Sequence, residues 1–288
     1  MTSLGLPGGP TALRILLGSQ LRRLREGRGI SAQEAAKAIR GSESKISRIE
    51  LGRNAVREID VADLLSLYGV TDLDEREQML SLASQANRPG WWYRYNDILP
   101  SWFQAYIGLE EAAESIRVYE MQFIPGLLQT EAYATAVLAL GDIASDEMER
   151  HVLLRKERQR RFLNGELRLW ALLDEEVLRR PVGNQDIMRA QLTHLVNASE
   201  HRNFVLQIIP RGVVGHAAPS GFSILRFGDR EMQDIVYVEQ LTSALYLDKR
   251  PEVDRYLLAM ERMSIVAAEP RESAGIIRAI MEETGGTA

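Results

Sequence analysis

Residues 31–52 contain two short amphipathic helical patterns separated by a turn signal, and no other stretch of the chain restricts the fold as strongly. Ser31 and Glu34 stand three residues apart, which is the spacing of a capping box at the first turn of a helix. Arg40-Gly41 interrupts that helix, and Ser42 is placed to cap a second one. We therefore expect two helices in close succession, the second of which ends where the segment does, at a glycine.

The apolar residues of these two helices recur at helical spacing, which places them on one inner face. They are Ala35, Ala36, Ile39, Ile46 and Ile49. Ala36 supplies the small side chain that two helices need where they cross at a steep angle. This is the arrangement of a helix-turn-helix, in which the second helix enters the major groove of DNA.

The outward positions of the second helix are polar, as a major-groove reader requires. We expect Glu43, Ser44, Lys45 and Ser47 to contact base edges, with Arg48 on the same face. Gln33 and Arg53 are expected to contact phosphate. A single Arg on a helix surface is usually only solvated, but that interpretation does not account for a cluster of Arg residues beside a recognition helix.

Three further amphipathic helices complete a five-helix module: one over the leucines from Leu13 to Leu24, one over 59–68, and one capped by Asp72 that runs to about residue 85. With its stretches LRRLREGRGISAQEAA and SKISRIELGR, the chain resembles the lambda-repressor-like (Xre) family over residues 13–86. Family members usually carry Gln where this chain has Ala32, so one phosphate contact is expected to be lost. They also carry Gly where this chain has Arg40, and we expect the left-handed turn residue to shift to Gly41.

Charge is distributed unevenly along the chain. Residues 14–57 hold eleven Lys or Arg and four Glu, a net charge of +7, although the whole chain carries −5. The rest of the chain therefore carries −12. A basic face on an acidic protein would orient the molecule on a polyanion such as DNA.

A Pro-Gly break at 89–90 precedes seven of the chain's nineteen aromatic residues, and we place the domain boundary there. The aromatic window is either a hydrophobic knot that docks the domains or a site for a ligand or for domain coupling. Its candidate residues are Trp91, Trp92, Tyr95, Trp102 and Tyr106. The expected limits are a disordered tail over 1–12, a DNA-binding domain over 13–87, a regulatory and dimerisation domain over 88–282, and a second tail over 283–288.

The second domain alternates helical and strand patterns. Ser145 is expected to cap a long helix that contains a basic run at 155–161, a solvated face or a further contact surface. Strands are expected near 167–173, 204–209, 222–227 and 235–239, with a hairpin turn at 228–231, and helices over 185–198, 251–267 and 272–282. The chain as a whole is expected to be mostly α with a small sheet, an α+β fold.

Residues 88–282 resemble the C-terminal domain of unknown function found in actinobacterial regulators of the WhiJ type. The matching stretches are PGWWYRYNDILPSWFQAYIGLE, FIPGLLQTEAYA, LLDEEVLRRPVG, QLTHL and IVYVE. The resemblance implies a DNA-binding transcriptional regulator that is often accompanied by a small partner protein.

Catalysis and metal binding find little support. The chain has no Cys, which excludes disulfides, thiolate metal sites and a Cys nucleophile. The four His residues show no metal-ligand spacing, and the acidic run 174–176 follows a strand where Asp174 is a natural helix cap. We expect the protein to have no enzymatic activity and to bind neither a cofactor nor a metal. Without a long apolar run or a leader pattern, we also expect no membrane association and a cytoplasmic location.

These features together predict a sequence-specific transcriptional regulator that binds operator DNA as a homodimer. Dimerisation is expected because one short recognition helix covers only a half-site. The second domain would receive a signal from a small partner protein or a small-molecule effector. The alternative is a protein-interaction or metabolite-sensing module in which DNA binding is secondary.

Overall fold

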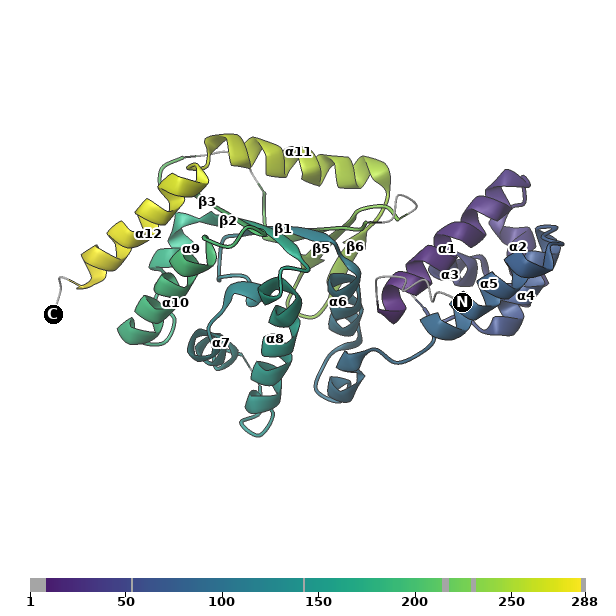
Figure 1. Ribbon diagram of the computed structural model, residues 1–288, viewed down its shortest axis with the longest axis horizontal. Helices are drawn as coiled ribbons and strands as arrows, with labels where there is room; N and C mark the ends of the chain where they lie inside the picture. Colours follow the sequence, from purple (N-terminus) through teal and green to yellow (C-terminus); the bar gives the residue numbers. More distant parts are fainter. Residues whose placement is uncertain (1–8, 53, 142, 214–217, 229–231, 286–288) are drawn as a thin grey trace. The chain divides into compact units, whose positions relative to one another are not determined.

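The computed structural model describes residues 9–52, 54–141, 143–213, 218–228 and 232–285 (Figure 1). The chain divides into two compact units. The first comprises residues 1–113 with 227–232, and the second comprises 114–226 with 233–288. The first unit thus extends past residue 87, where the sequence placed the boundary.

The first unit is helical. Its elements are α1 (Pro10–Gly27), α2 (Ala32–Ala38), α3 (Glu43–Glu50), α4 (Glu58–Leu67), α5 (Leu73–Ala86), the 3-10 helix η1 (Trp91–Tyr95) and α6 (Ser101–Ala112). The five expected helices are all present. α1 begins at Pro10, inside the stretch expected to be a tail, because Pro at the first position fixes a helical φ without losing a hydrogen bond. Residues 1–8 of that stretch lie outside the described residues.

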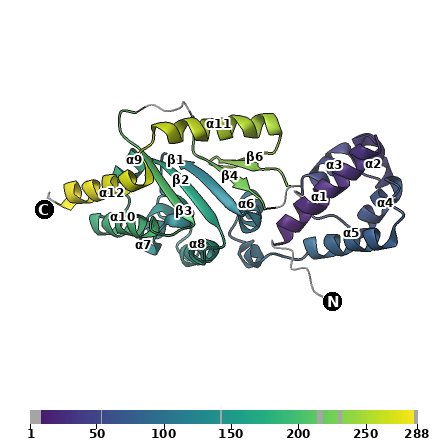
Figure 2. The same ribbon diagram turned by 45° about the horizontal axis from the view of Figure 1, so that its top comes forward.

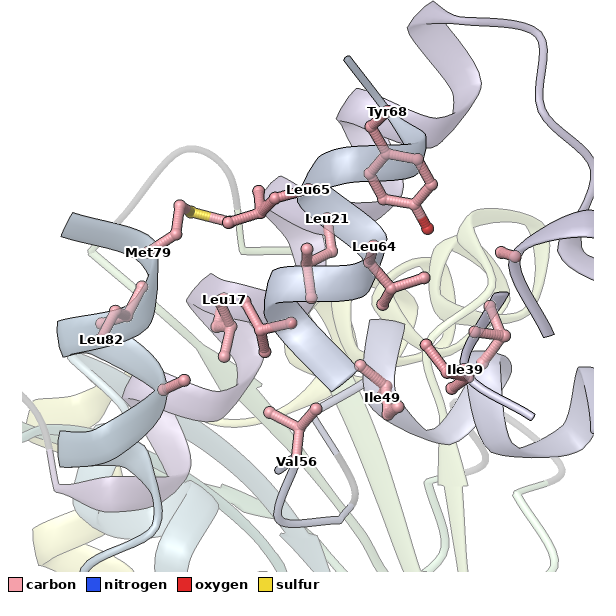
Figure 3. Close-up of a cluster of buried hydrophobic side chains, with 14 of the residues drawn as sticks. Leu17, Leu21, Ile39, Ile49, Val56, Leu64, Leu65, Tyr68, Met79 and Leu82 are labelled. Carbon is pink, nitrogen blue, oxygen red and sulfur yellow. The ribbon is translucent and has the colours of Figure 1, made fainter. Parts of the chain in front are cut away.

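One apolar core holds the first five helices together. Leu17 and Leu21 of α1 meet Leu64 and Leu65 of α4, and all four side chains are almost fully buried (Figure 3). The inner faces of α2, α3 and α5 close the core through Ala35, Ala36, Ile39, Ile46, Ile49, Met79 and Leu82. The alanines and isoleucines predicted to face inward in α2 and α3 are therefore confirmed.

The second unit combines helices with a sheet, which confirms the α+β class. Its strands are β1 (Ser115–Glu120), β2 (Arg168–Asp174), β3 (Phe204–Ile209), β4 (Phe222–Arg226), β5 (Ile235–Glu239) and β6 (Ala244–Leu247). Its helices are η2 (Gly126–Leu128), α7 (Glu131–Leu138), α8 (Met148–Leu163), α9 (Glu175–Arg179), α10 (Gln185–Ala198), α11 (Arg250–Val266) and α12 (Pro270–Gly285).

The strand order is β3-β2-β1-β4-β5-β6. β1, β2 and β3 are parallel neighbours, whereas β4, β5 and β6 join the sheet in antiparallel fashion. The crossovers between the parallel strands carry α7 to α10, as such connections require. α11 covers one face of the sheet, and α7, α8 and α10 lie on the other (Figures 1 and 2).

Several sequence expectations need correction. β1 and β6 were not expected as strands. α8 begins at Met148 rather than next to Ser145, and its first turn has no side-chain cap. α12 continues to Gly285, so the expected tail from residue 283 is helical at its start. Residues 229–231 of the expected hairpin turn lie outside the described residues, although β4 and β5 do pair.

Candidate nucleic-acid interface

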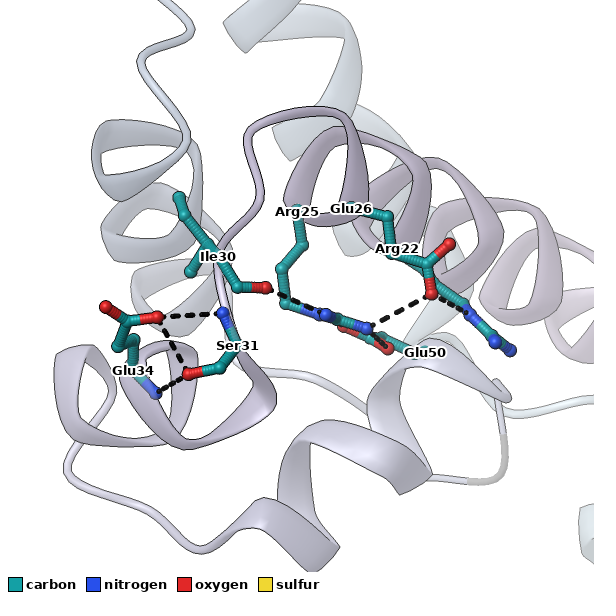
Figure 4. A network of polar contacts seen from close by, with 7 residues as sticks. All are labelled: Arg22, Arg25, Glu26, Ile30, Ser31, Glu34 and Glu50. Carbon is teal, nitrogen blue, oxygen red and sulfur yellow. Dashed lines mark hydrogen bonds and ion pairs between the residues drawn. The ribbon is translucent and has the colours of Figure 1, made fainter.

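The start of α2 is fixed by the capping box that the sequence predicts. The Ser31 hydroxyl accepts a hydrogen bond from the Glu34 amide (3.2 Å), and the Ser31 amide donates to Glu34 Oε2 (2.8 Å) (Figure 4). Hydrogen bonds that the Ser31 amide and the Ser31 hydroxyl donate to Glu34 Oε2 lower the pKa of the Glu34 carboxyl. Because that carboxylate already occupies the positive end of the helix, a DNA phosphate approaching nearby Gln33 would meet a negative charge.

The turn between α2 and α3 departs from the expectation. Arg40 itself adopts the left-handed conformation, with φ of 50°, and Gly41 does not. The Gly41 amide donates to the Ala36 carbonyl (2.8 Å) and the Arg40 amide to the Lys37 carbonyl (3.1 Å), which is the Schellman pattern of helix ends. That pattern places the left-handed residue two positions after the helix, at Arg40, whatever side chain stands there.

α3 presents the expected polar face. Ser42 caps it by accepting from the Lys45 amide (3.2 Å), and its apolar positions are buried in the core. The side chains of Glu43, Ser44, Ser47 and Arg48 are exposed. Arg48 Nη1 donates to the Ser44 hydroxyl (3.1 Å), so these two residues would meet DNA as a pair. Arg53 lies outside the described residues.

The Lys45 side chain does not point outward with the other polar side chains of α3, as the sequence predicted. Its Nζ forms an ion pair with Asp60 Oδ2 of α4 (2.8 Å), and its side chain is 33% exposed. Arg57 completes the pair, with Nη2 2.6 Å from Asp60 Oδ1 and Nε 3.1 Å from Oδ2. Lys45 therefore connects α3 to α4, and a base contact would require it to leave Asp60.

The Asp60 carboxylate should make stability fall in acid. The hydrogen bonds from Arg57, followed by those from Lys45, hold its pKa below the ordinary value. A depressed folded-state pKa stabilises the protein above the unfolded pKa of about 3.9, and the contribution disappears as the pH falls through the folded value. We expect Asp60→Asn to lower the free energy of unfolding at pH 7 and to have a much smaller effect near pH 2. Urea unfolding at both pH values measures this, and an equal loss at both would contradict it.

A buried ion pair holds α3 against α1. Arg25 Nε and Nη2 donate to Glu50 Oε1 (2.6 Å) and Oε2 (2.9 Å), and Arg25 Nη1 donates to the Ile30 carbonyl (2.9 Å) (Figure 4). The two charged side chains are only 12% and 8% exposed. Tyr68 lies beside them, and burial raises the pKa of its phenol. The pair fixes the C-terminal end of α3.

Two glycines allow α1 and the end of α3 to approach at backbone distance. A Cβ at Gly18 would stand 2.4 Å from the Ile49 carbonyl oxygen and 2.6 Å from that of Glu50. Gly52 has a φ of 63°, and a Cβ there would stand 2.6 Å from the Ile15 Cα. Side chains at either position would push α3 out of its place.

Several of the Lys and Arg residues of segment 14–57 already form ion pairs with carboxylates of the first unit. Arg25, Lys45 and Arg57 are engaged by buried carboxylates, and Arg22 pairs with Glu26 (2.8 Å). Lys37, Arg40 and Arg48 expose their side chains on or beside α2 and α3. Among the described residues on or directly beside α2 and α3, the cationic charge that faces solvent therefore resides mainly in these last three residues.

Comparison with known families supports this interpretation of the first unit. Residues 16–79 match the model of a helix-turn-helix domain. Residues 103–279, more than half of the chain, match the model described as domain of unknown function DUF5753. The chain belongs to the DUF5753 family. No curated protein and no solved structure matches it significantly. The helix-turn-helix match supports a DNA-binding regulator.

In this DUF5753 protein the aromatic window belongs to the first unit. Trp92, Tyr95 and Tyr106 are buried, and Trp91 and Trp102 are half-buried. Trp92 lies against Gly90 and Gly108, where added Cβ atoms would stand 2.4 and 2.9 Å from its ring. A Cβ at Gly108 would also overlap Thr11 of α1, so α6 packs tightly on α1. Trp92, one of the candidates for a ligand site, thus contributes to this packing.

The other candidate groups are dispersed. Burial lowers the pKa values of His151 and His194. His216 lies outside the described residues. Within the described parts of the chain, no three His, Asp or Glu side chains gather as a metal site would require. Asp174 caps α9 through the Glu176 amide (3.0 Å), as expected. In the same parts of the chain, no helix is long and apolar enough to cross a membrane.

Sequence analysis missed the two buried acids that position α3. Glu50 and Asp60 each occupy an inward helical position and find Arg or Lys partners on other elements. A signal was available, because an acidic residue in the apolar stripe of a helix is rarely buried without a partner. Their partners could not be named, since that requires the arrangement of the helices.

Proposed function

We propose that this protein is a cytoplasmic, sequence-specific transcriptional regulator whose helix α3 reads the major groove of an operator. The exposed face of Glu43, Ser44, Ser47 and Arg48 is the observation that carries the proposal. These side chains offer acceptors and donors at the N-terminal part of a helix, where major-groove readers place them. The five-helix arrangement supports a module of the lambda-repressor-like type.

The contacts that hold α3 in place favour sequence-specific recognition of bases over non-specific electrostatic binding to DNA. The Arg25–Glu50 pair, the Lys45–Asp60 pair and the close approach at Gly18 fix both ends of the helix. A base-reading surface needs such rigid support, because hydrogen bonds to base edges depend on distance and angle. Phosphate contacts from Lys37, Arg40 and Arg53 would add affinity without sequence preference.

We further propose that the protein acts as a homodimer and that the DUF5753 unit receives a signal. One recognition helix of eight residues covers a half-site, and a two-fold pair would read two half-sites about one helical turn apart. The aromatic segment 91–106 leads from the helix-turn-helix match into the DUF5753 match, and this position in the chain supports a role in coupling the two. The alternative, a sensor in which DNA binding is secondary, predicts DNA affinity without sequence preference.

Replacing Glu43 by alanine tests whether this residue contacts a base. The Glu43 carboxylate would accept a hydrogen bond from a cytosine amino group, so its loss should relax preference at one base pair by about 1–3 kcal/mol. Selection of binding sites from a random library, followed by titration at fixed salt, measures the change. Glu77→Ala on α5 is the matched control, since it removes another exposed carboxylate. An unchanged site preference in Glu43→Ala would contradict the assignment of this residue.

Arg53→Ala separates phosphate contacts from base contacts. It should weaken binding to all sequences alike and reduce the salt dependence of affinity by about one unit.

Sedimentation of the full chain on full-site and half-site DNA tests the dimer. A monomer with undiminished affinity for the full site would contradict dimerisation.

A further inference from the structure

Helix α11 has apolar side chains on two faces. Its inner face packs against the sheet through Val253, Met260 and Met263, which are almost fully buried in the core of the second unit. Its outer face carries Leu258 and Ile265, whose side chains are 46% and 76% exposed. No described helix or strand of the second unit lies over this outer face (Figures 1 and 2). Large apolar side chains aligned on an exposed helix face are typical of a surface that another protein element covers.

The exposed apolar residues of α11 follow a seven-residue repeat. Pro251, Leu258 and Ile265 stand seven positions apart, and all three are exposed. Seven residues are almost two turns of an α-helix, so the direction of the side chain drifts by only about 20° per repeat. The three residues therefore form one row along the helix, which we call the outer row. A row with this repeat allows two helices to pack side by side along their length.

Charged side chains of opposite sign flank the outer row on its two sides. On a helix that turns by about 100° per residue, Asp254 and Glu261 lie about 40–60° to one side of Leu258. Arg255 and Arg262 lie at similar angles on the other side. All four charged side chains are exposed. The outer face of α11 therefore has an acidic edge, an apolar centre and a basic edge.

This order of charges selects the direction in which a second copy can pack. If a two-fold axis runs parallel to α11, the acidic edge of each copy faces the basic edge of the other, and the outer row meets itself. In an antiparallel pair each edge would face its own equivalent, which places like charges opposite one another. Within one copy, Arg250 Nε lies 3.9 Å from Asp254 Oδ2, but both side chains are more than half exposed, so Asp254 stays accessible. The charges of α11 thus favour a parallel pair.

We propose that the outer face of α11 is the dimerisation surface of this protein, and that two copies pack with their α11 helices parallel. Leu258 of one copy then faces Leu258 of the other. Arg255 of each copy lies opposite Asp254 of the other, and the same holds for Arg262 and Glu261. A contact centred on one pair of helices is smaller than most stable interfaces, so we expect dissociation in the micromolar range. The proposal names the surface of the homodimer, and in that respect it rests on the proposed function.

Single cysteines test the pairing directly, because the chain has no Cys of its own. Full-length Leu258→Cys and Ile265→Cys are each oxidised by dissolved oxygen with a copper catalyst, and the disulfide-linked dimer is measured by non-reducing electrophoresis. A parallel pair brings each position close to its own equivalent, so both variants should cross-link. An antiparallel pair centred on Leu258 would cross-link only the first. Leu153→Cys on α8 is the matched control, since this side chain is exposed to a similar extent (45%), and it should not cross-link.

Charge reversal tests the two edges. Arg255→Glu with Arg262→Glu makes both edges acidic, whereas Asp254→Arg with Glu261→Arg makes both basic. Each double variant alone should self-associate at least about tenfold more weakly than the parent in sedimentation, because like charges then face one another. An equimolar mixture of the two double variants should recover the association, since acidic edges again meet basic ones.

A matched pair of reversals outside α11 controls for the change in net charge. Arg271→Glu with Arg278→Glu alters two exposed residues of α12, and this variant should self-associate like the parent. Circular dichroism shows that each variant is folded before its association is compared.

Three results would overturn the proposal: no cross-linking of Leu258→Cys above the Leu153→Cys control, cross-linking of Leu258→Cys without Ile265→Cys, or unchanged self-association of both charge-reversed variants. A dimer that persists in sedimentation with any of these results would keep the proposed homodimer and assign its interface to another surface. Loss of sequence-specific DNA binding in the unmodified protein would contradict the proposed function and leave the α11 pair intact.

Discussion

Replacing Gly18 by alanine is expected to lower the free energy of unfolding of the helix-turn-helix unit by about 3 kcal/mol, the upper range for overpacking. The added Cβ would stand 2.4 Å from the Ile49 carbonyl oxygen, so α1 and α3 must separate. Helix propensity opposes this effect, since alanine in a helix interior is favoured over glycine by about 1 kcal/mol. A net loss of stability therefore measures the close approach directly.

Gly27→Ala is the matched control for Gly18→Ala. Gly27 belongs to the same helix, and a Cβ there would meet nothing within 4 Å. We expect this variant to be neutral or to gain up to about 1 kcal/mol. Chemical denaturation gives both values, and DNA titration should show weaker operator binding for Gly18→Ala alone. Equal stabilities of the two variants would show that α1 and α3 tolerate the extra atom.

Local signals explain what the sequence could predict. The capping residues Ser31, Ser42 and Asp72 act on amides three residues away, so the starts of α2, α3 and α5 are readable from short segments. The strand at 204–209 and the helix at 185–198 were likewise predicted with their bounds. These elements combine strong periodicity with clear termini.

Long-range contacts explain what the sequence could not predict. In β1, Arg117 takes the polar position between Ile116 and Val118, and its guanidinium lies 5.1 Å from the centre of the Trp170 ring on the neighbouring strand, a contact that only the paired strands create. Spacing places Lys45 on the exposed face of α3, but Asp60 draws it inward from another helix. Glu120, Gly221 and Glu239 come side by side only when β1 pairs in register with the distant β4–β5 pair.

Removing Arg25 should be the most costly single change in the polar network of the first unit. Arg25→Met leaves Glu50 buried without its partner, and breaking one side of a buried ion pair typically costs about 3–5 kcal/mol. The comparison is Arg22→Met, in the same helix. Its guanidinium pairs with Glu26 on the surface, where both side chains are about half exposed, and such pairs contribute about 0–1 kcal/mol.

A double variant shows whether the Arg25–Glu50 pair adds stability or only fixes the position of α3. Arg25→Met with Glu50→Leu removes both charges, and replacement of a buried pair by apolar side chains is often neutral or stabilising. We therefore expect the double variant to recover most of the stability lost in Arg25→Met, as measured by urea unfolding. Its operator preference should nevertheless weaken, because the bidentate bonds that hold the end of α3 are gone. If Arg25→Met and Arg22→Met lose equal stability, the buried pair does not hold α1 and α3 together.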